Sequence, residues 1–163
     1  MINTQFYKLA DEALSHECTL IECFTDALDK DPTEKKARIA EYKCAKYRYA
    51  AVSAVHVVIH NINRCRSLHN LEATHYLLLP FDELFKQHED YLALYNAAAE
   101  ADKPDYSLYY AMLAFIESET AKLESKLPHA SDWETVELVE RIGGFKFAKA
   151  CLDEAWGKRE VGA

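Results

Sequence analysis

The distribution of glycine along the chain is uneven, and it limits the folds and sites that the sequence can form. All four glycines of this 163-residue sequence lie from Gly143 onward. Phosphate-binding loops, dinucleotide-binding turns and the nucleophile elbow of hydrolases all require glycine, because a β-carbon would block their backbone conformations or ligand contacts. Residues 1–142 therefore hold none of these motifs, which excludes the common classes of nucleotide-binding protein and hydrolase.

The hydrophobic pattern predicts an all-α fold. Apolar residues recur at intervals of three and four along most of the chain, and no segment shows sustained two-residue alternation. The length suits one domain with its own core, without help from disulfides. We therefore expect a single helical domain over residues 1–156, a bundle of five to seven helices, followed by a flexible tail over 157–163.

Prolines and capping signals set the expected helix bounds. The predicted helices cover residues 4–28, about 32–65, 67–79, 81–101, 104–126 and 131–156, and the third and fourth could be one bent helix. The second is the long central helix, and Asp31-Pro32-Thr33-Glu34 marks its start. In the last helix, Gly143-Gly144 is expected to interrupt the helix, as a kink or a close approach of backbones.

The long central helix carries one polar stripe within one of the most apolar stretches of the chain. Steps of four and three place seven polar or amphipathic side chains on one face: Tyr42, Lys46, Tyr49, Ser53, His56, His60 and Asn63. We call these residues the polar seam. Its first part, from Tyr42 to Tyr49, is expected at the surface or at an interface, with Tyr42, Lys46 and Tyr49 as candidate interaction residues. Its second part, from Ser53 to Asn63, is where a buried polar network would lie if there is one.

Two histidines of the seam form the candidate metal site. His56 and His60 lie one helical turn apart, a spacing at which both imidazoles can reach one metal ion. The zinc-peptidase pattern needs glutamate directly after the first histidine, and this chain has Val57 there. A metal would need a further ligand, for which helix 4–28 and His75 offer candidates. The alternative is that both imidazoles are hydrogen-bonded across the bundle, and no cofactor is expected.

A short basic stretch provides an enzymatic alternative. The stretch from Arg64 to His69 holds an arginine and a histidine separated by four residues, which resembles the active-site element of HEPN-type ribonucleases. The resemblance implies metal-independent RNA cleavage, with His69 as acid or base and Arg64 stabilising phosphate charge. The alternative is a basic helix end that opposes the helix dipole.

Charge is distributed unevenly along the sequence. Residues 35–66 hold eight lysines and arginines and one acid, Glu41, whereas the whole chain has a formal net charge of -8. The basic segment could bind nucleic acid or be neutralised by acidic neighbours, and the overall acidity favours neutralisation. Nucleic acid is therefore not the expected partner.

These observations favour an interaction protein over an enzyme. No glycine-rich loop, complete metal-ligand set or catalytic-triad spacing is present in the sequence. The sequence shows no apolar run long enough for a membrane span, and its five cysteines form no C-x-x-C pair. Its first residues lack the basic and apolar pattern of a secretory signal, so we do not expect secretion. We expect a cytoplasmic adaptor, regulator or inhibitor that presents helix faces to another protein, or forms a homodimer. The alternatives are the HEPN-type ribonuclease and a bundle that binds a metal or small ligand.

Overall fold

The computed structural model describes residues 4–68, 93 and 103–159, and these form helices without a strand. The elements are α1 (Gln5–Asp29), α2 (Pro32–Ala37), α3 (Ile39–Leu68), α7 (Pro104–Lys126), the 3-10 helix η2 (Leu127–His129) and α8 (Asp132–Lys158). The predicted all-α bundle is confirmed. The helices predicted over 67–79 and 81–101 lie outside the described residues, apart from the end of α3 and the helical residue Ala93.

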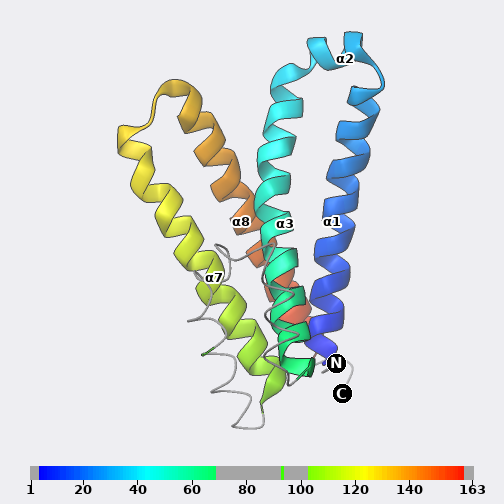
Figure 1. The fold of residues 1–163 in the computed structure, drawn as a ribbon, viewed down its shortest axis with the longest axis vertical. Helices are drawn as coiled ribbons and strands as arrows, with labels where there is room; N and C mark the ends of the chain where they lie inside the picture. The colour runs from blue at the N-terminus through cyan, green and yellow to red at the C-terminus, as the bar shows by residue number, and fades with distance from the viewer. Residues whose placement is uncertain (1–3, 69–92, 94–102, 160–163) are drawn as a thin grey trace.

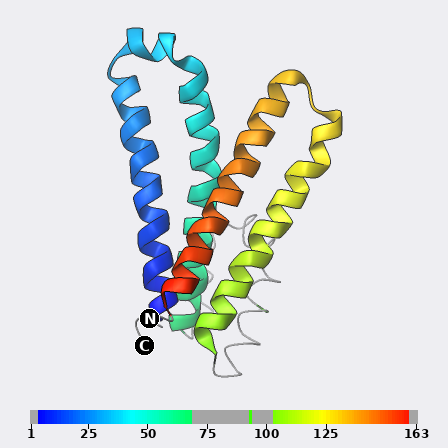
Figure 2. The same cartoon turned by 180° about the vertical axis from the view of Figure 1, so that it is seen from behind.

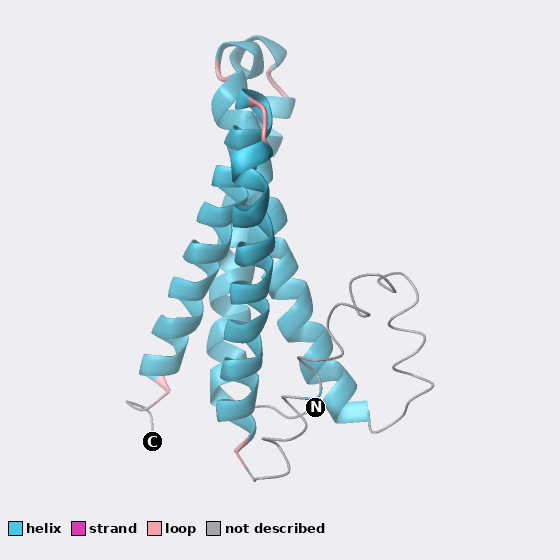
Figure 3. Cartoon of the chain, turned by 90° about the vertical axis from the view of Figure 1, so that its left-hand side faces the viewer, coloured by secondary structure: helices cyan, strands magenta, loops and turns pink. Residues whose placement is uncertain are grey.

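The described helices form two hairpins that diverge from a common base. Helix α1 runs antiparallel to α3 with α2 at their junction, and α7 runs antiparallel to α8 with η2 between them (Figure 1). Seen from behind, α8 crosses α3 diagonally and ends beside the start of α1 (Figure 2). In the view turned by 90°, the two hairpin tips lie in one narrow layer (Figure 3). In this second direction it is the opposite end of the bundle, at the base, where the helices are splayed. Helix α3 contacts α1, α7 and α8, which is the central position predicted for it.

Capping side chains fix the helix starts where the sequence predicts them. The Thr4 hydroxyl accepts a hydrogen bond from the Tyr7 backbone at the start of α1. Ser131 and Glu134 form the reciprocal capping box that begins α8. Such side chains satisfy amide groups that have no partner within the helix.

The predicted long central helix is interrupted near its start, which corrects its expected bounds. Asp31 caps a helix as predicted, but that helix, α2, is only six residues long and ends before Arg38. The Arg38 backbone has φ -112° and ψ 30°, outside the helical region, so that α2 and α3 are separate helices. Its amide donates to the Glu34 carbonyl and its carbonyl accepts from the Tyr42 amide, so the residue closes one helix and opens the next.

The predicted interruption of the last helix is also wrong, because α8 continues through Gly143-Gly144. The doublet marks the other expected feature, a close approach of backbones. A β-carbon on Gly144 would lie 2.8 Å from the Ala51 side chain and 2.9 Å from the Arg48 carbonyl oxygen. Gly157 and Lys158, which were expected in the tail, still belong to α8.

One hydrophobic core joins the two hairpins. The largest fully buried side chains come from all four long helices: Phe6, Phe115, Leu14, Ile59, Ile62, Leu108, Met112, Leu152, Val52 and Val55. Near the base, Tyr109 stacks on Trp156 with ring centroids 4.3 Å apart, and Phe6 packs edge-on against both rings. Burial of this apolar surface is the main force that holds the hairpins together.

Candidate functional site

The polar seam of α3 faces α1, and its side chains bond to polar groups of that helix. The contacts are Tyr42 with Asp29, Tyr49 with Glu22, His56 with Asp11, and His60 with Tyr7. They follow the length of the hairpin in antiparallel order. The seam is therefore an intramolecular contact between the first two long helices.

The tyrosine contacts lie in the half of the hairpin nearest α2. The Tyr49 hydroxyl donates to Glu22 over 2.6 Å, and this hydrogen bond raises the pKa of Tyr49. Asp29 accepts from both Lys35 and Tyr42, and these hydrogen bonds lower the pKa of the Asp29 carboxyl. Two of the three candidate interaction residues, Tyr42 and Tyr49, thus have partners within the chain.

The third candidate interaction residue, Lys46, is exposed. Its ammonium lies 5.4 Å from the centroid of the Tyr42 ring. At this distance, a cation still interacts with the ring face, so Lys46 also has a contact within the chain.

The histidines lie nearer the base, at the edge of the α1–α3 contact. His56 Nε2 lies 2.9 Å from Asp11 Oδ1, and the imidazole is 28 % exposed. His60 Nδ1 lies 3.0 Å from the Tyr7 hydroxyl, and His60 is exposed. This part of the seam is a hydrogen-bonded edge open to solvent, and the Asn63 side chain lies outside the described residues.

Within the described part of the chain, His56 and His60 have too few neighbouring ligands to form a metal site. Among the residues that the structure describes, no three His, Cys, Asp or Glu side chains are grouped so that they could hold a metal ion. His56 and His60 have Asp11 and Tyr7 as partners, which is the alternative considered for them. The metal hypothesis needs a ligand from elsewhere, and His75 lies outside the described residues.

The ribonuclease-like pair cannot be placed. Arg64 lies in α3, but its side chain and the whole of His69 are outside the described residues. Their catalytic roles therefore stay a prediction.

The basic segment is neutralised in part by acidic side chains of the chain itself. Its cations contact acidic or aromatic side chains in the following pairs: Lys35 with Asp29, Arg38 with Glu34 and Glu41, Lys43 with Trp133, Lys46 with Tyr42, and Arg48 with Glu140. Two of these pairs, Lys43–Trp133 and Arg48–Glu140, join α3 to α8. Pairing with acidic side chains, which the overall acidity favours, accounts for three of the six cations of this segment whose side chains the structure describes: Lys35, Arg38 and Arg48. Lys43 and Lys46 lie over aromatic rings, which do not neutralise their charge.

Three of the thiols, those of Cys18, Cys44 and Cys151, are suited to packing and not to nucleophilic chemistry. Burial, together with Glu17 and Glu154, raises the pKa of Cys151 to about 11. Burial also raises the pKa of Cys18 and of Cys44. These thiols are protonated at neutral pH, whereas a nucleophile requires the thiolate.

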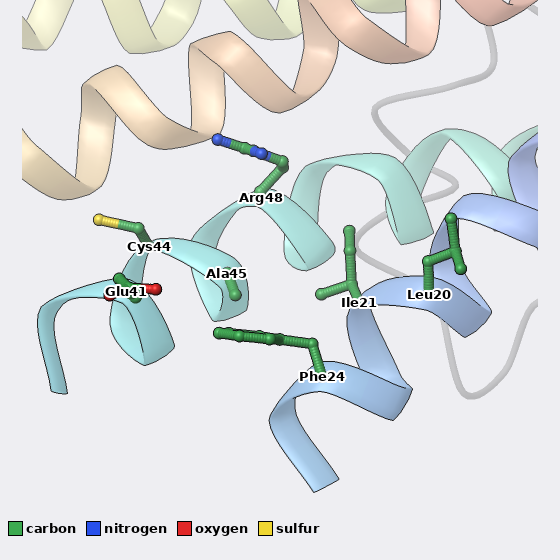
Figure 4. Close-up of a pocket in the computed structure, with 7 residues that line it drawn as sticks. All are labelled: Leu20, Ile21, Phe24, Glu41, Cys44, Ala45 and Arg48. Carbon is green, nitrogen blue, oxygen red and sulfur yellow. The ribbon is translucent and has the colours of Figure 1, made fainter. Parts of the chain in front are cut away.

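An apolar groove lies between the second half of α1 and the first half of α3. It has a volume of about 370 Å³ and is lined by Leu20, Ile21, Phe24, Glu41, Cys44, Ala45 and Arg48 (Figure 4). The Arg48 side chain extends toward α8, where its Nη2 lies 3.4 Å from Glu140. Leu20 is 50 % exposed at the groove wall. The groove thus presents apolar side chains to solvent next to α8.

Helix α8 carries an exposed apolar face on the side away from the core. Trp133, Val136, Val139 and Phe147 are 52 %, 44 %, 51 % and 40 % exposed, respectively. Gly143 lies among them, with open space around the position of a β-carbon. We call Trp133, Val136, Val139, Gly143 and Phe147 the α8 face. At 3.6 residues per turn, their spacing places all five on one side of the helix.

Sequence reasoning found the seam but not its partners, and it did not find the α8 face. Asp29 and Glu22 are spaced by seven residues, as are Tyr42 and Tyr49 in reverse order. Two antiparallel helices with matching seven-residue spacing are a signal that could have predicted these contacts. The α8 face had no such signal, because apolar residues on a helix are ordinarily turned toward the core.

The fold and the contacts define an all-α helical bundle with one apolar face left exposed. Among the described residues, no helix is long and apolar enough to cross a membrane. No protein-family model, curated protein or solved structure matches the chain.

Proposed function

We propose that the protein is a small cytoplasmic, non-enzymatic interaction protein, an adaptor, regulator or inhibitor, that binds a protein partner through the α8 face. The observation that carries this proposal is the gathering of Trp133, Val136, Val139 and Phe147, all at least 40 % exposed, on one side of one helix. Single exposed apolar residues are ordinary, but a contiguous exposed group of this kind marks interaction surfaces.

The composition of the α8 face supports a protein partner. Tryptophan and phenylalanine are enriched in the buried centres of protein interfaces, where charged residues are depleted. Two charged contacts border the face on the side toward α3 and form a polar rim: Lys43 lies over the Trp133 ring, and Arg48 pairs with Glu140. An apolar centre with a charged rim is the usual arrangement of such interfaces.

The contacts of the basic segment favour a protein over a nucleic acid as the partner. Arg38 and Arg48 each pair with glutamate side chains, and Lys43 covers the Trp133 ring. Nucleic-acid binding needs cations that are available to neutralise phosphates. Arg38 and Arg48 are already paired with carboxylates within the chain, and Lys43 already lies against an aromatic ring.

Photo-crosslinking from the α8 face tests the proposal. A photoreactive phenylalanine analogue replaces Phe147 in the full chain, which is expressed in the cell that naturally contains the protein. We expect a specific covalent adduct with a protein, because the Phe147 side chain would be buried in the complex. The same analogue at Glu117, an exposed position of α7, is the control. Equal adducts from both positions, or no adduct from Phe147, would overturn the proposal.

A further inference from the structure

The two adjacent glycines of α8 differ in what surrounds them. A contact within the monomer explains why residue 144 is glycine, since a β-carbon there would lie 2.9 Å from the Arg48 carbonyl oxygen. Gly143 has nothing within 4 Å of that position. Glycine in a helix interior costs up to about 1 kcal/mol relative to alanine, and no described contact of the monomer offsets this at Gly143. A close approach by a helix from outside the chain would account for it.

The residues around Gly143 form the same pattern in both directions along α8. Val139 and Phe147 lie four residues before and after it, and Val136 and Ala150 lie seven residues before and after it. All four are exposed. Because four and seven residues are close to one and two helical turns, all four share the face that contains Gly143. A face with this symmetry is complementary to itself when one copy is reversed.

We propose that the α8 face binds the α8 face of a second copy of this chain, antiparallel, with the two-fold axis passing beside Gly143. This inference rests on the proposed function and names its partner. Val139 would lie opposite Phe147 of the second copy, and Val136 opposite Ala150 of the second copy. Each contact would then pair a larger with a smaller apolar side chain, and the two glycines at the axis let the helices approach. Such a two-fold, same-surface arrangement is the commonest symmetry of soluble oligomers.

Charge predicts how this association responds to salt. Each chain has a formal net charge of -8, so two copies repel one another at long range. The centre of the paired surface consists of apolar side chains and glycine. Salt screens the repulsion between the copies and leaves the apolar contact intact. The association is therefore expected to strengthen as ionic strength rises. It should also be weak, because one helix per chain forms a small interface.

Sedimentation equilibrium of the full chain over a range of concentrations tests this pairing. We expect a reversible monomer–dimer equilibrium that Gly143→Glu weakens by about tenfold or more, because two glutamates would face each other at the axis. The substitution has open space in the monomer, so the thermal midpoint should not fall. A strict monomer, or a dimer that Gly143→Glu leaves unchanged, would overturn the pairing, as would association that weakens with salt.

Gly157→Glu is the matched control. It makes the same charge change on the same helix, at a second glycine with nothing within 4 Å of its β-carbon position. In the antiparallel pair, Gly157 lies beyond the start of the second α8 at Asp132. We therefore expect Gly157→Glu to dimerise like the unmodified chain, and a loss equal to that of Gly143→Glu would overturn the proposed axis.

The crosslinking experiment separates failure of this pairing from failure of the proposed function. An adduct of twice the mass of the chain from Phe147 supports pairing with a second copy. An adduct with a different protein, together with a monomer in sedimentation, overturns the pairing but supports the proposed function. The absence of an adduct together with a monomer overturns both.

Discussion

His56 and Asp11 join the middle of α3 to the first half of α1: the imidazole Nε2 lies 2.9 Å from the carboxylate Oδ1. The two residues are 45 positions apart in the sequence. Both side chains are partly exposed, so the contact contributes as a surface interaction does and not as a buried pair. Its structural role is to fix one edge of the α1–α3 hairpin.

Removal of this contact should lower stability modestly. Asp11→Ala is expected to reduce the free energy of unfolding by about 0.5–1 kcal/mol, as for the loss of a partly exposed hydrogen bond. Urea denaturation followed by circular dichroism measures the change. Asp26→Ala, at an exposed position of the same helix, is the control and should have a smaller effect. Equal losses in the two variants would show that the His56–Asp11 contact does not stabilise the hairpin.

The two glycines of α8 should respond oppositely to alanine. Gly144→Ala places a β-carbon 2.8 Å from the Ala51 side chain and close to the Arg48 backbone, so α3 and α8 must separate. We expect a loss of about 1–3 kcal/mol, typical of overpacking. Gly143→Ala meets nothing within 4 Å and should stabilise the monomer by up to about 1 kcal/mol through helix propensity. Thermal denaturation at low protein concentration compares the variants, and destabilisation by both would contradict the assignment of the contact to Gly144.

Tyr109 should contribute to the loss of stability at alkaline pH. Burial and the hydrogen bond to Asp153 raise its pKa to about 12 from the ordinary value of 10.0. The folded state therefore favours the protonated hydroxyl, and this stabilisation is complete below pH 10 and lost as pH rises toward 12. Tyr109→Phe keeps the ring stacked on Trp156 and removes the hydroxyl. It should cost about 1 kcal/mol at neutral pH and flatten the stability profile between pH 10 and 12.

A profile for Tyr109→Phe that falls as steeply as that of the unmodified chain would assign the alkaline transition to other groups. Tyr110→Phe is the comparison, because its hydroxyl accepts from Tyr106 at an exposed position. It should leave stability at neutral pH nearly unchanged.

The contribution of the capping box at the start of α8 to the free energy of unfolding should be measurable by substitution of Ser131. Ser131 accepts from the Glu134 amide, and Glu134 accepts in return from the Ser131 amide. Ser131→Ala removes the side-chain acceptor and is expected to cost about 1 kcal/mol. Ser131→Asp, which retains an acceptor oxygen, should restore most of that stability. If the aspartate variant is as unstable as the alanine variant, the cap is not what stabilises this end.

The interaction hypothesis and the ribonuclease alternative predict different results for Arg64→Ala. For an interaction protein, any RNA cleavage by the purified chain should be the same in Arg64→Ala, because it would come from a contaminant. In the alternative, Arg64 stabilises the charge that develops on phosphate, so its removal should abolish cleavage of single-stranded RNA. Gel analysis of RNA incubated with both proteins separates these outcomes.

The class of fold and most of the described helix starts follow from the sequence alone. Helical periodicity, Pro104 and the Ser131–Glu134 box depend on residues close together in the chain, so α1, α7 and α8 begin within a residue or two of the predicted positions. The break at Arg38 escaped prediction because its residues are compatible with a continuous helix. The break occurs where the chain reverses direction between α1 and α3, and α2 lies within that reversal.

Which helix faces are covered depends on how the helices pack in three dimensions. The polar seam was evident in the sequence, but whether it meets water or another helix depends on α1, whose Asp11 and Glu22 lie opposite it. Val136 and Val139 follow the same apolar periodicity as core residues, yet both are exposed. Periodicity shows which residues share a side of a helix, whereas the packing of the two hairpins determines which side is buried.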